Sequence, residues 1–329
     1  MPVIHNLVTI DEQAEFRNDV QLSDFEKEDT NLALLRSYLF TATAPQGQES
    51  STGLLRAVTE SFLNPRLDNR ITAIANYGHG KSHLALVLAN YFGKSFQSPE
   101  LKIIFNKIDQ ALDNPAQRNR FREFRENRNE FLVIRLRGDK PQSLREQFVL
   151  SLEQALKEHT ATRNVELPFW YQKAEQLLKG LNGDMLPKAN QFLEAYSMDV
   201  PLLIQDIQNR KDAAYDICIR LFTELHGVAP NFLGEVSMRE LINWASGHYC
   251  GDGKPLGGIF VLFDEFSLYI QRYGQRSAAG ELQDLLNGIE DQKGNAVFVA
   301  FAQHDPIQVA RNSIKTSQNL ETLEKELNR

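Results

Sequence analysis

Cysteine is scarce in this chain: only Cys218 and Cys250 occur among 329 residues. Two cysteines cannot build the disulfide framework of a small secreted domain, and they lack the Cys/His spacing of a zinc site. No apolar run approaches the roughly 20 residues that a membrane helix needs. The N-terminus, MPVIHNLVTIDEQAEF, has no basic segment followed by an apolar one, so it does not read as a secretory signal. These absences favour a cytoplasmic protein that does not contact a membrane.

Positive charge is also in short supply. Lys and Arg number 36 against 43 Asp and Glu, which gives a formal net charge of −7. This balance excludes a protein that coats nucleic acid through bulk positive charge, although it leaves room for a local basic channel. Hydrophobic residues make up 42% of the chain and charged residues 24%, the balance of a globular protein.

The chain does contain short apolar runs that have the character of buried parallel strands. They are rich in Ile, Val and Phe, lack polar alternation, and span 71–75, 131–136, 259–264 and 296–302. A helical pattern follows each of the first three runs. After the second run, Ser143 and Glu146 have the spacing of a helix capping box. Alternating strands and helices predict an α/β fold with a parallel sheet.

The spacing of these runs also predicts a domain organisation. Residues 1–64 are expected to form a helical segment leading into the core, and 65–157 the first part of the core. Residues 158–250 have a helical pattern almost throughout. Because a crossover between parallel strands needs only about a dozen residues, this stretch is predicted to be a large helical insertion. Residues 251–329 are expected to complete the core.

The stretch ITAIANYGHGKSHLALVLANYFG, residues 71–93, resembles a phosphate-binding loop between a strand and a helix. Gly78 and Gly80 let successive backbone N–H groups point at phosphate oxygens, Lys81 can reach the β- and γ-phosphates, and the Ser82 hydroxyl can bind Mg²⁺. The following helix directs its positive end at the anion. The pattern G-x-x-x-x-G-K-[ST] wants glycine at position 75, where alanine is a mild departure because the position requires a small side chain.

This loop predicts a set of nucleotide-binding residues: Tyr77, Gly78, His79, Gly80, Lys81, Ser82 and His83. The alternative is a glycine-rich turn in which the letters GKS occur by chance. The strand before the loop and the helix after it favour the nucleotide site.

A second signal is GGIFVLFDEFSLYI, residues 257–270, in which an apolar strand runs straight into two carboxylates. In a parallel sheet, carboxylates at the C-terminal end of a strand lie at the ligand edge. Asp264 is predicted to hold Mg²⁺ through water, on the same ion as Ser82, and Glu265 to orient and deprotonate an attacking water. The alternative is an acidic cap on the following helix. A second carboxylate favours hydrolysis over phosphate transfer by a nucleotide kinase.

The third signal is NAVFVAFAQHDP, residues 295–306. A polar residue at the end of the strand beside the acidic one can hydrogen-bond the γ-phosphate or the attacking water. Gln303 is the first candidate for this sensor and His304 the second. The alternative, that QHDP is simply a turn that opens a helix, remains open.

Taken together, the three motifs resemble the additional-strand class of P-loop ATPases, and AAA+ ATPases in particular. Within that group, residues 65–165 and 237–310 resemble the large ATPases of BREX-type phage-defence systems (the BrxC/PglY group). The resemblance implies an AAA+-like core that binds ATP and Mg²⁺ and hydrolyses ATP, with Lys81, Glu265 and Gln303 as catalytic residues. It also implies a role in a multi-protein defence complex that engages DNA.

The resemblance also sets expectations about what the chain lacks. An AAA+ sheet has a fifth strand after the sensor strand, followed by a small helical lid, and residues 303–329 read as helix or polar tail. We therefore expect an N-terminal piece of a longer protein, truncated before the lid. AAA+ ATPases often take an arginine finger from a neighbouring copy in a homo-oligomer. Arg272 and Arg276 are candidates only by their position after the acidic motif.

Two other functions stay open at this point. One is a nucleotide-gated switch or scaffold that hardly hydrolyses ATP, and the other is a DNA-remodelling or initiator ATPase outside phage defence. The segment PAQRNRFREFRENRNEF bears on DNA, because Arg118, Arg122 and Arg125 recur at helical spacing. Interleaved glutamates favour instead a solvated helix face, with Phe121 and Phe124 packing inward.

Overall fold

In a computed structural model of the chain, the residues whose structure is described are 20–43, 50–75, 80–165, 168–209, 211–228, 230, 237–251, 253–273, 278–313, 321 and 324. Within these ranges, no helix combines the length and the apolar character that crossing a bilayer requires. The predicted nucleotide-binding residues Tyr77, Gly78 and His79 lie outside the described residues, as does Arg276.

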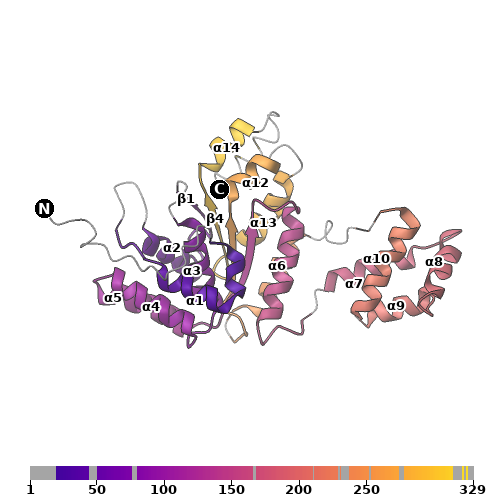
Figure 1. The fold of residues 1–329 in the computed structure, drawn as a ribbon, viewed down its shortest axis with the longest axis horizontal. Helices are drawn as coiled ribbons and strands as arrows, with labels where there is room; N and C mark the ends of the chain where they lie inside the picture. Colours follow the sequence, from indigo (N-terminus) through magenta and orange to yellow (C-terminus); the bar gives the residue numbers. More distant parts are fainter. Residues whose placement is uncertain are drawn as a thin grey trace.

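The centre of the structure is a four-stranded sheet in which every strand pair is parallel (Figure 1). Its strands are β1 (Arg70–Ile74), β2 (Leu132–Arg137), β3 (Ile259–Asp264) and β4 (Ala296–Ala302), and their order across the sheet is β1-β4-β3-β2. The predicted parallel α/β fold is confirmed. The bounds of β3 and β4 match the apolar runs, because every residue of these central strands is buried. The outer strands β1 and β2 differ from the predicted runs by one residue.

Helices cover both faces of the sheet (Figure 1). One face carries the short 3-10 helix η2 (Leu22–Glu26), α1 (Glu28–Ser37), α2 (Ser51–Leu63), α3 (Lys81–Gly93), α4 (Pro99–Ala111) and α5 (Pro115–Glu126). The other face carries α6 (Leu144–Glu158), α11 (Met238–Tyr249), α12 (Phe266–Tyr273), α13 (Ala278–Asp291) and α14 (Pro306–Ser313). Alternate strand residues feed the two cores: Phe260 and Leu262 pack toward α3, whereas Val261 and Phe263 pack toward α6 and α13. Burial on both faces explains the apolar runs of the sequence.

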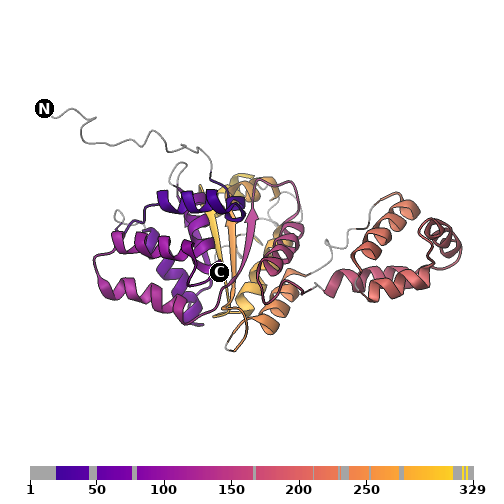
Figure 2. The ribbon, with the colours of Figure 1, turned by 60° about the horizontal axis from the view of Figure 1, so that its bottom comes forward.

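Four further helices form a separate cluster that projects to one side of the sheet (Figures 1 and 2). They are α7 (Pro168–Lys179), α8 (Met185–Glu194), α9 (Val200–Gln208) and α10 (Asp212–His226), and they enclose an apolar core of their own. The predicted insertion, 158–250, also took in α11. That helix instead packs on the sheet through Met238, Leu241, Ile242 and Ala245. Its apolar spacing is the same as that of the neighbouring helices, so the sequence pattern could not show which core it joins.

The outer edge of β2 is closed by the helix that follows it. The backbone N–H of Arg135 donates to Ser151 Oγ at 2.8 Å, and that of Arg137 donates to Gln147 Oε1 at 3.2 Å. Both acceptors lie on α6, which begins at the predicted cap, because Ser143 Oγ accepts from the Glu146 N–H at 3.2 Å. An edge strand with satisfied N–H groups is protected from pairing with other chains. The same bonds fix the end of β2 in place.

The arginines of α5 do not form a common surface for DNA. Arg125 is fully buried, and its guanidinium donates to the carbonyls of Lys94 and Asn129, both at 2.9 Å. Arg122 forms a two-pronged ion pair with Asp109, at 2.8 Å for one of its bonds. Arg128, just past the helix, donates to the carbonyl of Gly257, before β3, and to that of Phe62, in the last turn of α2. Phe121 and Phe124 are buried as predicted, but most of the arginines hold the fold together.

Candidate functional site

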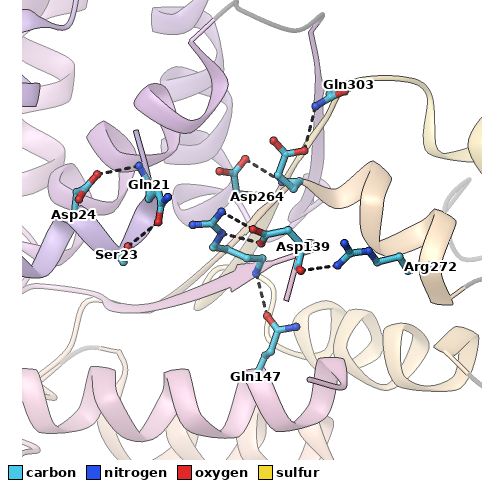
Figure 3. A network of polar contacts seen from close by, with 10 residues as sticks. Gln21, Ser23, Asp24, Asp139, Gln147, Asp264, Arg272 and Gln303 are labelled. Carbon is cyan, nitrogen blue, oxygen red and sulfur yellow. Dashed lines mark hydrogen bonds and ion pairs between the residues drawn. The ribbon is translucent and has the colours of Figure 1, made fainter. Parts of the chain in front are cut away.

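Polar side chains gather where the four strands end. The C-terminal ends of β1, β2, β3 and β4 lie at one edge of the sheet because the strands are parallel. Lys81 and Ser82 start the helix after β1, Asp264 ends β3 and is followed by Glu265, and Gln303 follows β4. Figure 3 shows Asp264 and Gln303 close to this edge, together with Asp139 from the loop after β2.

The loop after β1 leads into α3 through a left-handed residue. Gly80 has φ 71° and ψ 24° and occupies the N-cap position of α3. No heavy atom would lie within 4 Å of an added Cβ, so glycine is needed here for its backbone conformation and not for space. The first N–H groups of α3 have no acceptor within the helix, and the helix dipole favours an anion at this end. The start of α3 therefore suits a phosphate group.

The Lys81 side chain reaches back to the residue that follows β1. Its Nζ donates to the carbonyl oxygen of Ala75 at 2.8 Å, and the Ala75 N–H donates in turn to the carbonyl of Ala302 at 3.1 Å. The ammonium is thus held beside the ends of β1 and β4. A phosphate bound at the start of α3 would compete with the Ala75 carbonyl for this ammonium.

Ser82 and Asp264 meet, as the two motifs predicted. The Asp264 side chain is 2% exposed, and burial raises its pKa above the ordinary value for an aspartate. A hydrogen bond from the Ser82 side chain opposes that rise, as do the N–H of Glu265 and the positive charges of Arg137 and Lys81. The carboxylate can stay ionised in a buried place only because donors and cations surround it.

The oxygen atoms of Ser82 and Asp264 fit a magnesium ion. In nucleotide sites Mg²⁺ takes one or two protein oxygens and completes its shell with water and substrate phosphates. In the part of the chain that is described, no group of three or more His, Cys, Asp or Glu residues could hold a metal ion. Two protein oxygens are too few to hold a structural metal ion on their own. They suit a magnesium ion that is also bound to the phosphates of a nucleotide.

Glu265 has the strained backbone that functional residues often show. Its φ is 54°, in the left-handed region that costs energy for a residue other than glycine. Its N–H donates to Asp264 Oδ1 at 2.9 Å, and its Oε2 accepts from Gln303 Nε2 at 3.1 Å (Figure 3). Partial burial raises the pKa of Glu265, and the negative charge of Asp264 raises it further. A carboxylate with a raised pKa is a better proton acceptor near neutral pH.

The predicted sensor Gln303 lies beside the predicted base. Its backbone N–H donates to Ser267 Oγ at 3.0 Å, which fixes the end of β4 against the start of α12. Its amide then reaches Glu265. His304, the second candidate, donates its backbone N–H to the same hydroxyl at 3.4 Å. The sensor and the acidic pair, which are 38 residues apart in sequence, are brought into direct contact by the sheet.

The side chain of His83 faces away from this group. Its Nε2 lies 2.7 Å from the carbonyl oxygen of Leu34, and its ring contacts the ring of Tyr38 edge-on at 4.9 Å between centroids. Burial lowers its pKa and so favours the neutral ring. The expectation that His83 binds the nucleotide is therefore limited to its backbone, because its imidazole joins α3 to the end of α1.

The segment Arg137–Gly138–Asp139 was missed by the sequence reasoning. Arg137 is paired in register with Asp264, and the Gly138 N–H donates to the Asp264 carbonyl at 2.9 Å. The Asp139 carboxylate accepts two bonds from the Arg137 guanidinium, at 2.9 and 2.7 Å. Arg272, a candidate arginine finger, donates to the Asp139 carbonyl (Figure 3). The sequence did contain a signal for this segment, because charged residues come at the end of the apolar run 131–136. In a parallel sheet, the end of that strand must lie at the same edge as Asp264.

A large hollow among the described residues lies elsewhere. It measures about 780 Å³ and is lined by residues such as Arg128, Gly257 and Asn295, near the N-terminal ends of β3 and β4. None of the predicted site residues lines it. Arg128 already donates to the Gly257 carbonyl there, and the hollow has no counterpart to the paired carboxylates. The predicted site residues that the structure describes lie at the opposite edge of the sheet.

Comparison of the chain with models of known protein families, with curated proteins and with solved structures finds no match. What the site does must therefore be inferred from its own residues.

Proposed function

We propose that the chain is an ATP-binding and ATP-hydrolysing P-loop module of the AAA+ type. The observation that carries the proposal is the convergence of Lys81, Ser82, Asp264, Glu265 and Gln303 at one edge of a parallel sheet. The strand order supports it as well. Strand β4, which ends next to Gln303, lies between the strand of the glycine loop and the strand of the acidic pair. It is in the place of the additional strand for which that ATPase class is named.

Each residue then has a definite task in binding. The N–H groups at the start of α3 bind phosphate oxygens, and Lys81 exchanges the carbonyl of Ala75 for the β- and γ-phosphates. Ser82 and Asp264 would hold Mg²⁺, which would neutralise part of the negative charge of the phosphates.

Hydrolysis needs a water in line with the γ-phosphate and a base to take its proton. Glu265 accepts the proton as the water oxygen bonds to the γ-phosphorus. The bond between that phosphorus and the bridging oxygen breaks, and ADP leaves with the electron pair. The contribution of the protein is positioning and charge stabilisation, as in other phosphoryl transfers. Gln303 must release Oε2 of Glu265, or share it, before that oxygen can bind the water.

One observation favours a nucleotide-gated switch as the second candidate. In this structure Glu265, the proposed base, already accepts a hydrogen bond from Gln303. Its pKa is raised by burial and by Asp264, and its backbone is in the left-handed region. If that bond persists when ATP is bound, the module binds nucleotide and turns it over slowly. The same residues serve both functions, so turnover separates them.

The setting of the module in a BREX-like phage-defence assembly rests on the resemblance of its motifs. DNA, other subunits of the assembly and further copies of the chain are its proposed partners. A DNA contact through α5 has little support, because Arg122 and Arg125 are engaged within the fold. Any DNA contact of this chain is therefore proposed for other surfaces or for the partner subunits.

Phosphate release from ATP tests the proposal. Wild type and Glu265→Gln are compared, with Glu123→Gln as control because Glu123 is an exposed glutamate of α5. We expect turnover in wild type and the control, and ATP binding without turnover in Glu265→Gln. Binding without turnover in wild type would favour the switch, and no binding would contradict both functions. Stimulation of turnover by duplex DNA would support a DNA-engaging ATPase.

A further inference from the structure

An arginine of the same chain lies beside the acidic pair. Arg137 is the last residue of β2, and its register partner is Asp264, the last residue of β3. Neighbouring strands are about 4.8 Å apart, so the two backbones meet at this point. Arg137 also lowers the pKa of both Asp264 and Glu265 through its positive charge, although burial raises both more strongly. Its charge therefore acts on both carboxylates of the site.

The side chain of Arg137 belongs to the face of the sheet that carries the glycine loop. Side chains alternate along a strand, and Val133 of β2 packs with Phe260 and Leu262 of β3 in the core shared with α3. Arg137 lies four residues after Val133, and Asp264 lies two residues after Leu262, so both point to this same face of the sheet. Asp264 also accepts a hydrogen bond from Ser82 of α3. Arg137 thus lies on the side of the sheet where a phosphate at the start of α3 would lie.

The guanidinium of Arg137 is held by one partner that an anion could replace. Within the described part of the chain, its two hydrogen bonds go to the carboxylate of Asp139, at 2.9 and 2.7 Å. The side chain of Arg137 is 18% exposed and that of Asp139 35% exposed, so the pair is not sealed in a core. A planar guanidinium binds phosphate in the same two-pronged way as it binds carboxylate. A phosphate that carries more charge than Asp139 can compete for it.

The backbone around this pair is fixed by hydrogen bonds to its neighbours. Gln147 accepts from the N–H of Arg137, and Gly138 donates to the carbonyl of Asp264. Arg272 donates to the carbonyl of Asp139. These bonds hold the main chain on both sides of Gly138, so only the Arg137 side chain has to turn in order to change partners. A change of side-chain rotamer is a small and fast motion.

We propose that Arg137 supplies the arginine that contacts the γ-phosphate from within the same chain, and that Asp139 holds it aside until nucleotide binds. The proposal rests on the function proposed above. It assigns to this site a cation that recognises the third phosphate and so distinguishes ATP from ADP. An arginine finger from a neighbouring copy was expected to stabilise the negative charge on the γ-phosphate. Under this proposal, Arg137 of the same chain provides at least part of that stabilisation.

Arg137 is better placed for this role than the other cations near the edge. Arg272 is bound to the Asp139 carbonyl. Arg135 lies two residues earlier on the same face of β2, but its guanidinium donates to Glu26 and Glu158 and packs over the ring of Phe25. Arg135 is therefore a matched control, since it is an arginine of the same strand and face that is committed to another cluster.

The test measures two quantities in folded variants of the chain. One is kcat at saturating Mg-ATP, and the other is the ratio of the Kd for ADP to the Kd for a non-hydrolysable ATP analogue. For Arg137→Ala we expect kcat to fall by about 10²–10³-fold, the usual effect of losing one donor to transition-state charge. The preference for the triphosphate should fall about tenfold or more, as expected for a hydrogen bond to a charged group. Arg135→Ala should keep both quantities close to wild type.

Two further variants test the details and guard against misfolding. Arg137→Lys keeps the charge but loses the planar fork, so its values should lie between those of wild type and Arg137→Ala. If Arg137→Ala does not fold, Arg137→Lys carries the test. Asp139→Asn removes the competing charge, so the preference for the triphosphate should be kept or increased. A loss of that preference in Asp139→Asn would contradict the holding role of Asp139.

The outcomes separate this inference from the proposed function. If Lys81→Ala abolishes ATP binding while Arg137→Ala keeps the triphosphate preference, the nucleotide site stands and the role of Arg137 is refuted. If wild type and Lys81→Ala bind ATP equally, the nucleotide site itself fails. The preference ratio is informative even for a module with slow turnover, because it depends on binding alone. A purely structural role of Arg137 would lower Tm without changing that ratio.

Discussion

Gly138, directly after β2, lies close against the backbone that follows Asp264. A Cβ at this position would lie 2.0 Å from the carbonyl oxygen of Glu265 and 2.8 Å from the backbone nitrogen of Tyr269. Ordinary contacts of a Cβ begin at 3.4 Å, so Gly138→Ala must separate the two segments by more than 1 Å. The obstructing atoms belong to backbone, which cannot turn aside as a flexible side chain would. The end of β2 or the Asp264–Glu265 turn has to move.

The size of the effect follows from that displacement. Forcing an additional carbon into a packed region costs about 1–3 kcal/mol, and a displacement of about 1 Å at a reacting group costs about 10²-fold in rate. We therefore expect Gly138→Ala to lower Tm by several degrees, at roughly 2–4 °C for each kcal/mol. Turnover should fall about 10²-fold, with a smaller change in ATP affinity because the start of α3 is not displaced.

Thermal unfolding, ATP binding and phosphate release measure these effects. Gly247→Ala is the matched control, since Gly247 lies in helix α11 and no atom would lie within 4 Å of its added Cβ. Alanine is favoured over glycine within a helix by up to about 1 kcal/mol, so the control should keep or raise Tm. Equal Tm and equal turnover in the two variants would refute the close approach at Gly138 and its link to Glu265.

Two further predictions follow from Glu265 and from Arg125. Glu265 must be ionised to accept a proton, and its pKa is raised by burial and by Asp264. Turnover should therefore be lost, as pH falls, at a pH above the ordinary glutamate value of 4.5. Gln303→Leu removes a donor to the ionised carboxylate, so its pH–rate profile should lose activity at a still higher pH; an unshifted or lowered acid limb would contradict the contact. Arg125→Ala leaves buried carbonyls without donors and should cost about 3 kcal/mol or more in the free energy of unfolding by urea, whereas a stable variant with weakened DNA binding would restore the DNA interpretation of α5.

Much of the fold and site could be predicted because the relevant signals are local. Strands β3 and β4 are buried on both faces, so their apolar runs mark their bounds. The strands are parallel, so residues that follow different strands must meet at one edge. That rule placed Ser82 near Asp264 and Gln303 near Glu265 before any contact was known.

The rest depended on partners that are remote in sequence. The spacing of the α5 arginines is that of an exposed face, but the acceptors of Arg125 are carbonyls supplied by Lys94 and Asn129. His83 was assigned to the nucleotide loop, and its ring instead meets Leu34 and Tyr38 of the N-terminal segment. The position of Arg137 follows only from the register of β2 against β3. Periodicity within one segment contains no information about such contacts.

Binding of Mg-ATP by wild type and by Lys81→Ala tests the central claim most directly. Lys81 is the cation that the structure holds beside the end of β1, at 2.8 Å from the Ala75 carbonyl, and Lys102→Ala serves as control because Lys102 is an exposed lysine of α4. Titration with a fluorescent ATP analogue should show binding by wild type and Lys102→Ala and none by folded Lys81→Ala. Equal binding by all three proteins, or binding by none of them, would contradict a nucleotide site at this edge of the sheet.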